Sequence, residues 1–135
     1  MASASKLILK NIFFTSYNPV PEQTDATPCI AGGTGMNLCD MAKDGIRTIA
    51  LSQELTAWSK LGQARKRINC GKGCVTIEGG QRVILKSTNY PDDSRCNGQF
   101  LVADAMNLRY RKRGDIFMLD RADNVSCRAD VYSID

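Results

Sequence analysis

The sequence contains no histidine. Serine–histidine and cysteine–histidine nucleophile pairs are therefore excluded, because both depend on imidazole as the general base. Acid–base chemistry must come from aspartate, glutamate, lysine, tyrosine or a perturbed cysteine. A zinc site could use only cysteine ligands, and no second closely spaced pair completes the one in "CGKGC". We therefore expect no metal and no cofactor.

Long hydrophobic runs are also missing. No stretch approaches the roughly eighteen consecutive apolar residues of a transmembrane helix, so the sequence predicts no membrane span. The opening "MASASKLILKNIFF" is partly apolar, but Lys10 and Asn11 interrupt it. A signal peptide has an uninterrupted apolar core and a small-residue cleavage site, so we interpret this segment as the first strand.

The length favours one domain. A chain of 135 residues can bury one core, and no linker, repeat or low-complexity tract divides it, so we predict a single domain over residues 1–135. The net charge of +4 favours anionic surroundings, such as a cell-wall polymer or nucleic acid, without requiring either.

Cysteine, by contrast, is abundant. Six irregularly spaced cysteines indicate disulfides and an oxidising destination, so we expect the protein to be secreted or otherwise extracytoplasmic. Six cysteines allow about fifteen pairings, and spacing alone does not choose among them. We favour Cys29 with Cys39 and Cys70 with Cys74. The six disulfide candidates are Cys29, Cys39, Cys70, Cys74, Cys96 and Cys127.

Strand-like runs bounded by Gly, Pro, Asn and Asp recur along the sequence. The glycine-rich "CIAGGTGMNLC" lacks the Gly-Lys-Ser/Thr ending and the following helix of a phosphate loop, so no nucleotide site is expected there. Many short strands and few helices predict a mostly β domain, small enough to close into a barrel. The expected strands are Leu7–Tyr17, Arg47–Leu51, Cys74–Glu78, Arg82–Ser87, Phe100–Asp104, Asp115–Leu119 and Ala129–Ile134.

One helix is predicted after Ser52. The segment "QELTAWSKLGQ" places Leu55, Trp58 and Leu61 at helical spacing, and Gly62 provides a stop signal. We interpret Trp58 as a core anchor.

Two aspartates near the end of the chain lie among apolar residues. Asp104 closes "LVAD", and Asp115 opens "DIFML" eleven positions later. A partly desolvated carboxylate costs stability unless it has partners or a task. If the two strands are neighbours in a closed sheet, both acids can lie at the same end of it. Each then raises the proton affinity of the other, and one can serve as a general acid.

Structural alternatives remain open for these residues. The aspartates can accept backbone hydrogen bonds, or pair with Arg109, Arg111 or Arg113 of the intervening "LRYRKRG". That segment is then a solvated loop, or a site for an anionic polymer. Nucleic acid is not the expected partner, because the loop offers one aromatic, Tyr110, and a second basic cluster would have to share its face.

Three blocks of the chain resemble the 3D domain, a family named for three aspartates and built on a double-psi β-barrel. They are "IALSQEL", "VADAMNLRYRKRGDIFML" and "FFTSYNPVPEQTDATPC", which is similar to the family's usual opening. The resemblance implies an all-β fold: a six-stranded double-psi β-barrel with one or two short helices, here stapled by disulfides.

The resemblance also implies a function. The family includes the catalytic barrel of MltA-type lytic transglycosylases, which cleave the glycan strand of peptidoglycan and form a 1,6-anhydro product without consuming water. It implies Asp115 as the catalytic acid and base and Asp104 as its support. The substrate-binding residues expected along the glycan groove are Tyr17, Thr24, Thr27, Asn107 and Arg109.

The chain departs from the family pattern at several positions. Ser52 stands where the first aspartate falls, and Ala105, Met106 and Asn107 replace a Thr-Gly-Gly element. A second class therefore stays open: a non-catalytic double-psi barrel that binds cell-wall glycan, or a structural subunit of an extracellular or phage assembly. Its partners are then a glycan polymer, further copies of the chain, or components of a secreted machine or virion.

Overall fold

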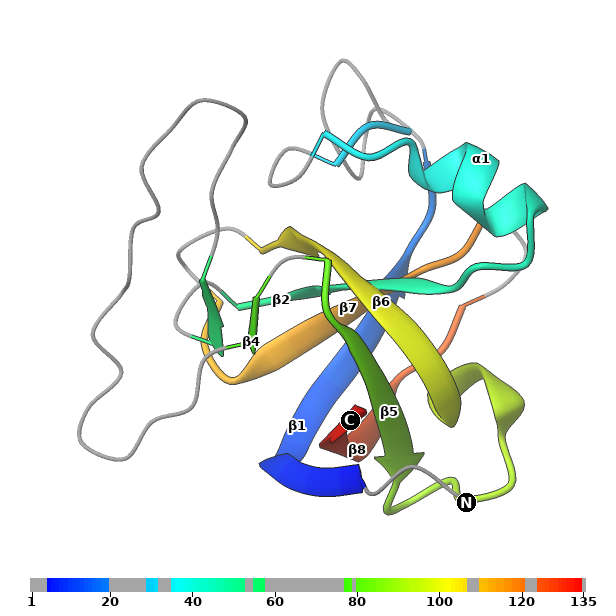
Figure 1. Ribbon diagram of the computed structural model, residues 1–135. Helices are drawn as coiled ribbons and strands as arrows, with labels where there is room; N and C mark the ends of the chain where they lie inside the picture. Colours follow the sequence, from blue (N-terminus) through cyan, green and yellow to red (C-terminus); the bar gives the residue numbers. More distant parts are fainter. Residues whose placement is uncertain are drawn as a thin grey trace.

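The computed structural model describes residues 5–19, 29–31, 35–52, 55–57, 77–78, 80–106, 110–120 and 124–134. Six strands close into a barrel in the spatial order β1-β7-β2-β6-β5-β8 (Figure 1). The predicted mostly β fold with a six-stranded barrel is therefore confirmed. The barrel strands are β1 (Ser5–Tyr17), β2 (Thr48–Leu51), β5 (Arg82–Ser87), β6 (Gly98–Ala105), β7 (Arg113–Phe117) and β8 (Cys127–Ile134).

Smaller elements accompany the barrel in the described part of the chain. They are helix α1 (Leu38–Lys43), the short strands β3 (Thr56–Ala57) and β4 (Ile77–Glu78), and the 3-10 helix η2 (Ser94–Cys96). The strands β3 and β4 pair with each other in a separate parallel sheet.

The barrel mixes parallel and antiparallel neighbours. The pairs β1–β7 and β2–β6 are parallel, whereas β1–β8, β2–β7, β5–β6 and β5–β8 are antiparallel. Exchanging β1 with β6, β2 with β7 and β5 with β8 leaves this pattern of neighbours and directions unchanged. The strand pairing therefore has an approximate two-fold symmetry.

Alternate residues of the strands fill the barrel. In β5, Val83 and Leu85 are fully buried while Arg82 and Lys86 are exposed, as expected for a strand with one face toward a core. Phe14 of β1 is a large side chain of this core. Its ring lies so close to Gly114 of β7 that a Cβ at position 114 would overlap it.

A second apolar cluster covers part of the outside of the barrel. Ala31, with Leu38 and Cys39 of α1, packs on Ala103 and Phe117. Phe117 belongs to the outward-facing residues of β7, because its neighbour Ile116 points into the barrel core. This packing attaches α1 to the outside of the barrel wall formed by β7, β2 and β6.

Helix α1 was not predicted. We expected no helix after the glycine-rich segment, but α1 begins directly after Asn37, whose side chain accepts a hydrogen bond from the Asp40 N–H. Asparagine is a favoured N-cap because its side-chain oxygen satisfies an N–H of the first turn. A helix of six residues is too short to show a helical repeat of apolar positions in the sequence.

The prediction of a helix after Ser52 is wrong in the part of that segment that the structure describes. Leu55 lies in a 3-10 turn, and Thr56–Ala57 form strand β3. The Ser52 hydroxyl does not cap a helix, because it accepts a hydrogen bond from the Arg113 N–H and donates one to the Arg113 carbonyl. Trp58 and the rest of that segment lie outside the described residues.

The predicted barrel strands agree closely with the structure. The ends of the six barrel strands differ from the predicted ends by at most two residues. The predicted strand Cys74–Glu78 contains β4, and its first three residues lie outside the described part of the chain.

Two disulfides join the described cysteines. The predicted bond between Cys29 and Cys39 is confirmed, with an S–S distance of 2.01 Å. A second bond, between Cys96 of η2 and Cys127 of β8, was not predicted. Cys70 and Cys74 lie outside the described residues. Disulfides persist in oxidising compartments, so both bonds indicate an oxidising environment. Within the described residues, no helix is long and apolar enough to cross a membrane.

Candidate functional site

Four strands present one row of residues on the outside of the barrel. Thr15 of β1 pairs with Asp115 of β7, Asp115 pairs with Ala50 of β2, and Ala50 pairs with Asp104 of β6. Paired residues on neighbouring strands share a face, and the neighbour Gly114 points inward toward Phe14. The row therefore faces outward. Because strands lie about 4.8 Å apart, the two aspartate Cα atoms are about 10 Å apart.

This row lies at the centre of the approximate two-fold symmetry of the strand pairing. The exchange of strands that preserves the pairing interchanges Asp115 with Ala50 and Thr15 with Asp104. The four positions thus form one line, with Asp115 and Ala50 in the middle and Thr15 and Asp104 at the ends. The two middle positions are chemically unequal, because Asp115 carries a carboxyl group and Ala50 only a methyl group.

Asp115 is the perturbed acid of the row. Burial raises the pKa of its carboxyl to about 6, against the opposing effects of the Thr15 hydrogen bond and the positive charge of Arg113. Thr15 Oγ1 donates to Asp115 Oδ1 at 3.0 Å, which leaves Oδ2 to carry the proton. We expected a raised pKa from the neighbouring carboxylate. The cause is instead loss of solvent around Asp115, because Asp104 is too far across Ala50 to dominate.

Tyr17 of β1 lies near both acids. Burial, followed by the negative charges of Asp104 and Asp115, raises the pKa of its hydroxyl well above the usual range. The hydroxyl therefore stays protonated and can act as a hydrogen-bond donor. Its ring meets Phe117 edge-on, with centroids 5.5 Å apart. The structure thus brings together three of the residues predicted from the sequence: Asp115, Asp104 and Tyr17.

Ser52 has a structural role at the end of β2. Its side chain is fully buried, and its hydroxyl makes two hydrogen bonds of 2.6 Å to the backbone of Arg113. These bonds fix the start of β7 two residues before Asp115. An ionised aspartate could accept from the Arg113 N–H but could not donate to the Arg113 carbonyl.

The other predicted site residues are not placed. Thr24, Thr27, Asn107 and Arg109 lie outside the described residues. The structural alternative of an ion pair with Arg113 is not seen, since Asp115 makes no salt bridge to a described residue. In the same described part of the chain, no group of three or more Cys, Asp or Glu side chains is arranged to hold a metal ion.

The sequence interpretation missed Thr15. A signal was available, because the alternation of "FFTSY" puts Thr15 on the same face as Tyr17. Nothing in the sequence indicates which acid it would meet, since its partner is 100 positions away.

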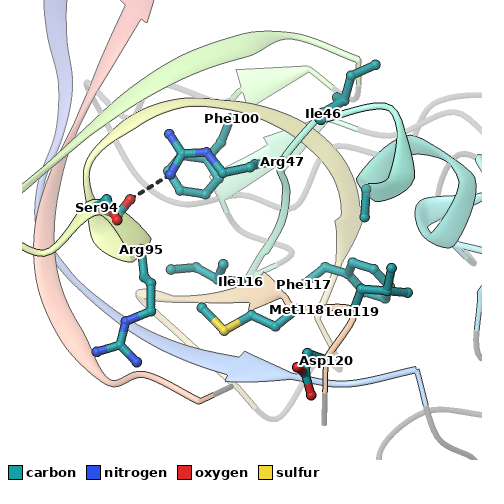
Figure 2. A pocket seen from close by; sticks show the side chains of 12 residues that line it. Ile46, Arg47, Ser94, Arg95, Phe100, Ile116, Phe117, Met118, Leu119 and Asp120 are labelled. Carbon is teal, nitrogen blue, oxygen red and sulfur yellow. Dashed lines mark hydrogen bonds between the residues drawn. The ribbon is translucent and has the colours of Figure 1, made fainter. Parts of the chain in front are cut away.

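A cavity of about 500 Å³ lies where β2 and β6 begin and β7 ends (Figure 2). Arg47 lies over the Phe100 ring, 4.1 Å from its centroid, and donates to the Ser94 carbonyl at 2.6 Å. Asp104 and Asp115 do not line this cavity. The lining residues are Ala42, Gly45, Ile46, Arg47, Ser94, Arg95, Phe100, Ile116, Phe117, Met118, Leu119 and Asp120.

Comparison with known proteins returns no match for this chain, whether to a protein-family model, a curated protein or a solved structure.

Proposed function

We propose that the chain is a peptidoglycan-cleaving domain of the lytic transglycosylase type, with Asp115 as its acid and base. One observation carries the proposal: Asp115 is a largely buried, outward-facing carboxyl with a pKa of about 6. A general acid needs a pKa near the working pH, and an ordinary aspartate, with a pKa of about 3.9, is too acidic.

The proposed reaction uses the two states of one carboxyl. Protonated Asp115 gives its proton to the glycosidic oxygen between N-acetylmuramic acid and N-acetylglucosamine. The bond from this oxygen to the anomeric carbon of the muramic acid breaks, and N-acetylglucosamine leaves with the proton as its hydroxyl. The C6 hydroxyl of the muramic acid then attacks the anomeric carbon and passes its proton to the Asp115 carboxylate, which closes the 1,6-anhydro ring. One acid suffices because the substrate supplies the nucleophile, whereas ordinary glycosidases use a carboxylate pair.

Three neighbours support this role. The hydrogen bond from Thr15 holds one carboxyl oxygen of Asp115, so that the other carries the proton. Tyr17 stays neutral and can donate to a sugar oxygen. In the proposal, Asp104, about 10 Å from Asp115 across Ala50, contacts the substrate. Its role in the proposal is therefore substrate positioning and not control of the Asp115 pKa.

The fold assignment in this proposal is the double-psi β-barrel of the 3D family. The two-fold symmetric pairing of six strands, with two parallel pairs, supports it. The disulfides Cys29–Cys39 and Cys96–Cys127 support a site of action outside the cytoplasm, in the cell wall, in the extracellular space or on a virion.

The test is digestion of purified peptidoglycan, with mass analysis of the soluble products. Wild-type protein should release 1,6-anhydro muropeptides, and Asp115→Asn should release none. Asp92→Asn is the matched control, because Asp92 is exposed in the turn before η2 and undergoes the same chemical change. Absence of anhydro products from the wild type at pH 5–7 would refute the proposal.

A second candidate is a non-catalytic barrel that binds glycan or builds an assembly. The buried Ser52 favours it, because a structural serine replaces one of the family's three acids. Sedimentation of the protein with peptidoglycan, without soluble products and unaffected by Asp115→Asn, would select this candidate. Recovery of the protein in a fibre or particle would select its structural form.

A further inference from the structure

Two arginines lie against one phenylalanine on the outside of the barrel. Phe13 of β1 is paired with Arg113 of β7 on one side and with Arg128 of β8 on the other. The guanidinium carbons of Arg113 and Arg128 are 5.1 Å and 5.4 Å from the centroid of the Phe13 ring. We call these three residues the arginine–phenylalanine row. It crosses three adjacent strands although Phe13 and Arg128 are far apart in the sequence.

Arg113 is held in place more firmly than a typical surface arginine. Its guanidinium carbon is also 5.1 Å from the centroid of the Tyr110 ring, so it has two aromatic contacts. Its backbone is fixed by Ser52, and its Nε is buried with no hydrogen-bond partner among the described residues. A side chain held in this way loses little further conformational entropy when it binds a ligand.

The row carries positive charge without ion pairing. Neither Arg113 nor Arg128 forms a salt bridge within the described part of the chain, where Arg95 pairs with Asp93. Two guanidinium groups beside one ring raise the local positive potential, which favours an anion nearby. The adjacent residues Arg111 and Lys112 are exposed and add to the positive potential.

Two carboxylates lie near the row, but within the described residues neither forms a salt bridge with it. Asp115 is two residues from Arg113 and accepts from Thr15, and Asp130 is two residues from Arg128 and accepts from the Asn11 N–H. Arg113 does act on Asp115 through its charge, so the row and the acid share one surface. Along a strand, two residues span about 7 Å. A polymer that runs along β7 over Asp115 would also extend over Arg113.

We propose that the arginine–phenylalanine row binds carboxylates on the peptide side chains of the glycan strand, next to the point of cleavage. This inference rests on the proposed function, since it takes the same polymer as the ligand. Guanidinium groups match carboxylates through paired N–H donors. Single-stranded nucleic acid fits less well, because the Phe13 ring already carries two guanidiniums and is not an open platform for a base.

The position of Arg113 links binding to chemistry. An anion bound at Arg113 offsets the positive charge that lowers the pKa of Asp115. Substrate carrying acidic side chains therefore favours the protonated form of Asp115, which the first step of cleavage requires. Strands stripped of their peptides lack this effect.

The test measures binding in an Asp115→Asn background, so that no ligand is consumed. Uncross-linked glycan strands with intact peptide side chains are titrated by calorimetry, in parallel with strands whose peptides have been removed. Arg113→Gln and Arg128→Gln should each weaken binding of the peptide-bearing strands about tenfold and reduce its salt dependence. Neither change should alter binding of the stripped strands. Arg82→Gln, an equal change of charge on the exposed face of β5, should leave both affinities within about twofold.

Unchanged binding in both row variants would overturn the inference, as would equal binding of stripped and intact strands. A single-stranded oligonucleotide that binds more tightly than the glycan, and does so through the row, would overturn the choice of partner. Arg128 is exposed, so its variant reports on binding even if Arg113→Gln fails to fold. Row-dependent binding by a wild type that releases no anhydro product would refute cleavage alone. Cleavage with unchanged binding in the row variants would refute this inference alone.

Discussion

Thr15 donates a hydrogen bond of 3.0 Å to Asp115, a residue 100 positions later in the chain. The parallel pairing of β1 with β7 creates this contact. It is the only hydrogen bond that a described residue makes to the Asp115 carboxyl, so it sets which oxygen is available to hold a proton. The chemistry proposed for this barrel therefore depends on a hydroxyl whose hydrogen-bond partner is distant in the sequence.

Replacing Thr15 with valine should raise the pKa of Asp115. The hydrogen bond stabilises the carboxylate and lowers the pKa, so its loss favours the protonated form. Titration of the aspartate carboxyl carbons by NMR checks this result. In a peptidoglycan-cleavage assay, kcat/KM should fall as pH rises through about 6 for the wild type, and the fall should move to higher pH in the variant.

Thr88→Val is the control for this change. Thr88 is exposed and far from Asp115 in the pairing scheme, and its hydroxyl donates to the Arg128 carbonyl. It should leave the titration of Asp115 unchanged. A pKa of Asp115 that falls in Thr15→Val would contradict the role assigned to Thr15.

Asp115→Asn should stabilise the fold at high pH and leave it unchanged at low pH. The pKa of Asp115 is about 6 in the folded state and about 3.9 in the unfolded state, so between these values the folded state binds more protons. Stability therefore falls as pH rises from about 4 to about 6, and the loss is complete above that range. The asparagine cannot ionise and avoids the loss.

Urea unfolding at pH 4 and pH 8 measures this effect. The variant should match the wild type at pH 4 and exceed it by about 1–3 kcal/mol at pH 8. A variant that is less stable than the wild type at pH 8 would show that the carboxylate serves the fold and not the chemistry.

Ser52→Ala should destabilise the barrel by about 1–3 kcal/mol. The change removes both 2.6 Å hydrogen bonds to the Arg113 backbone. The Arg113 carbonyl still accepts a hydrogen bond from the Ser52 N–H. The destabilisation therefore comes mainly from the Arg113 N–H, which loses its hydrogen bond to the serine hydroxyl. Ser52→Asp should be worse, because it buries a charge at a position with no exposed surface. Equilibrium unfolding of the three proteins gives the order, and a Ser52→Asp variant as stable as the wild type would contradict this account.

Gly114→Ala should destabilise the protein by about 1–3 kcal/mol or more, because its Cβ would overlap the Phe14 ring. Phe14→Leu alone should also cost stability, since Phe14 is fully buried. In the double variant the smaller leucine makes room for the alanine. The double variant should therefore lose less stability than the sum of the losses in the two single variants. A double-mutant cycle from unfolding curves measures the coupling, and strict additivity would contradict direct contact.

The fold class and most strand positions follow from the sequence alone. Alternation and turn residues are local properties, so the ends of Arg82–Ser87 are predicted without error and those of the other barrel strands to within two residues. Local pattern failed at the helix after Ser52. The apolar residues there have helical spacing, but the Ser52 hydroxyl instead makes hydrogen bonds to the backbone of Arg113. This contact forms only when β7 lies beside the end of β2.

The composition of the candidate site, in contrast, depends on how the strands are arranged in three dimensions. Asp104 and Asp115 could be identified as candidates from the sequence, because a carboxylate within an apolar run is visible in the local sequence pattern. Their separation by Ala50, the bond from Thr15 and the placement of Arg128 beside Phe13 depend on the order in which six strands close. Strand order and register are set by the packing of the whole core, and no local segment of the chain contains that information.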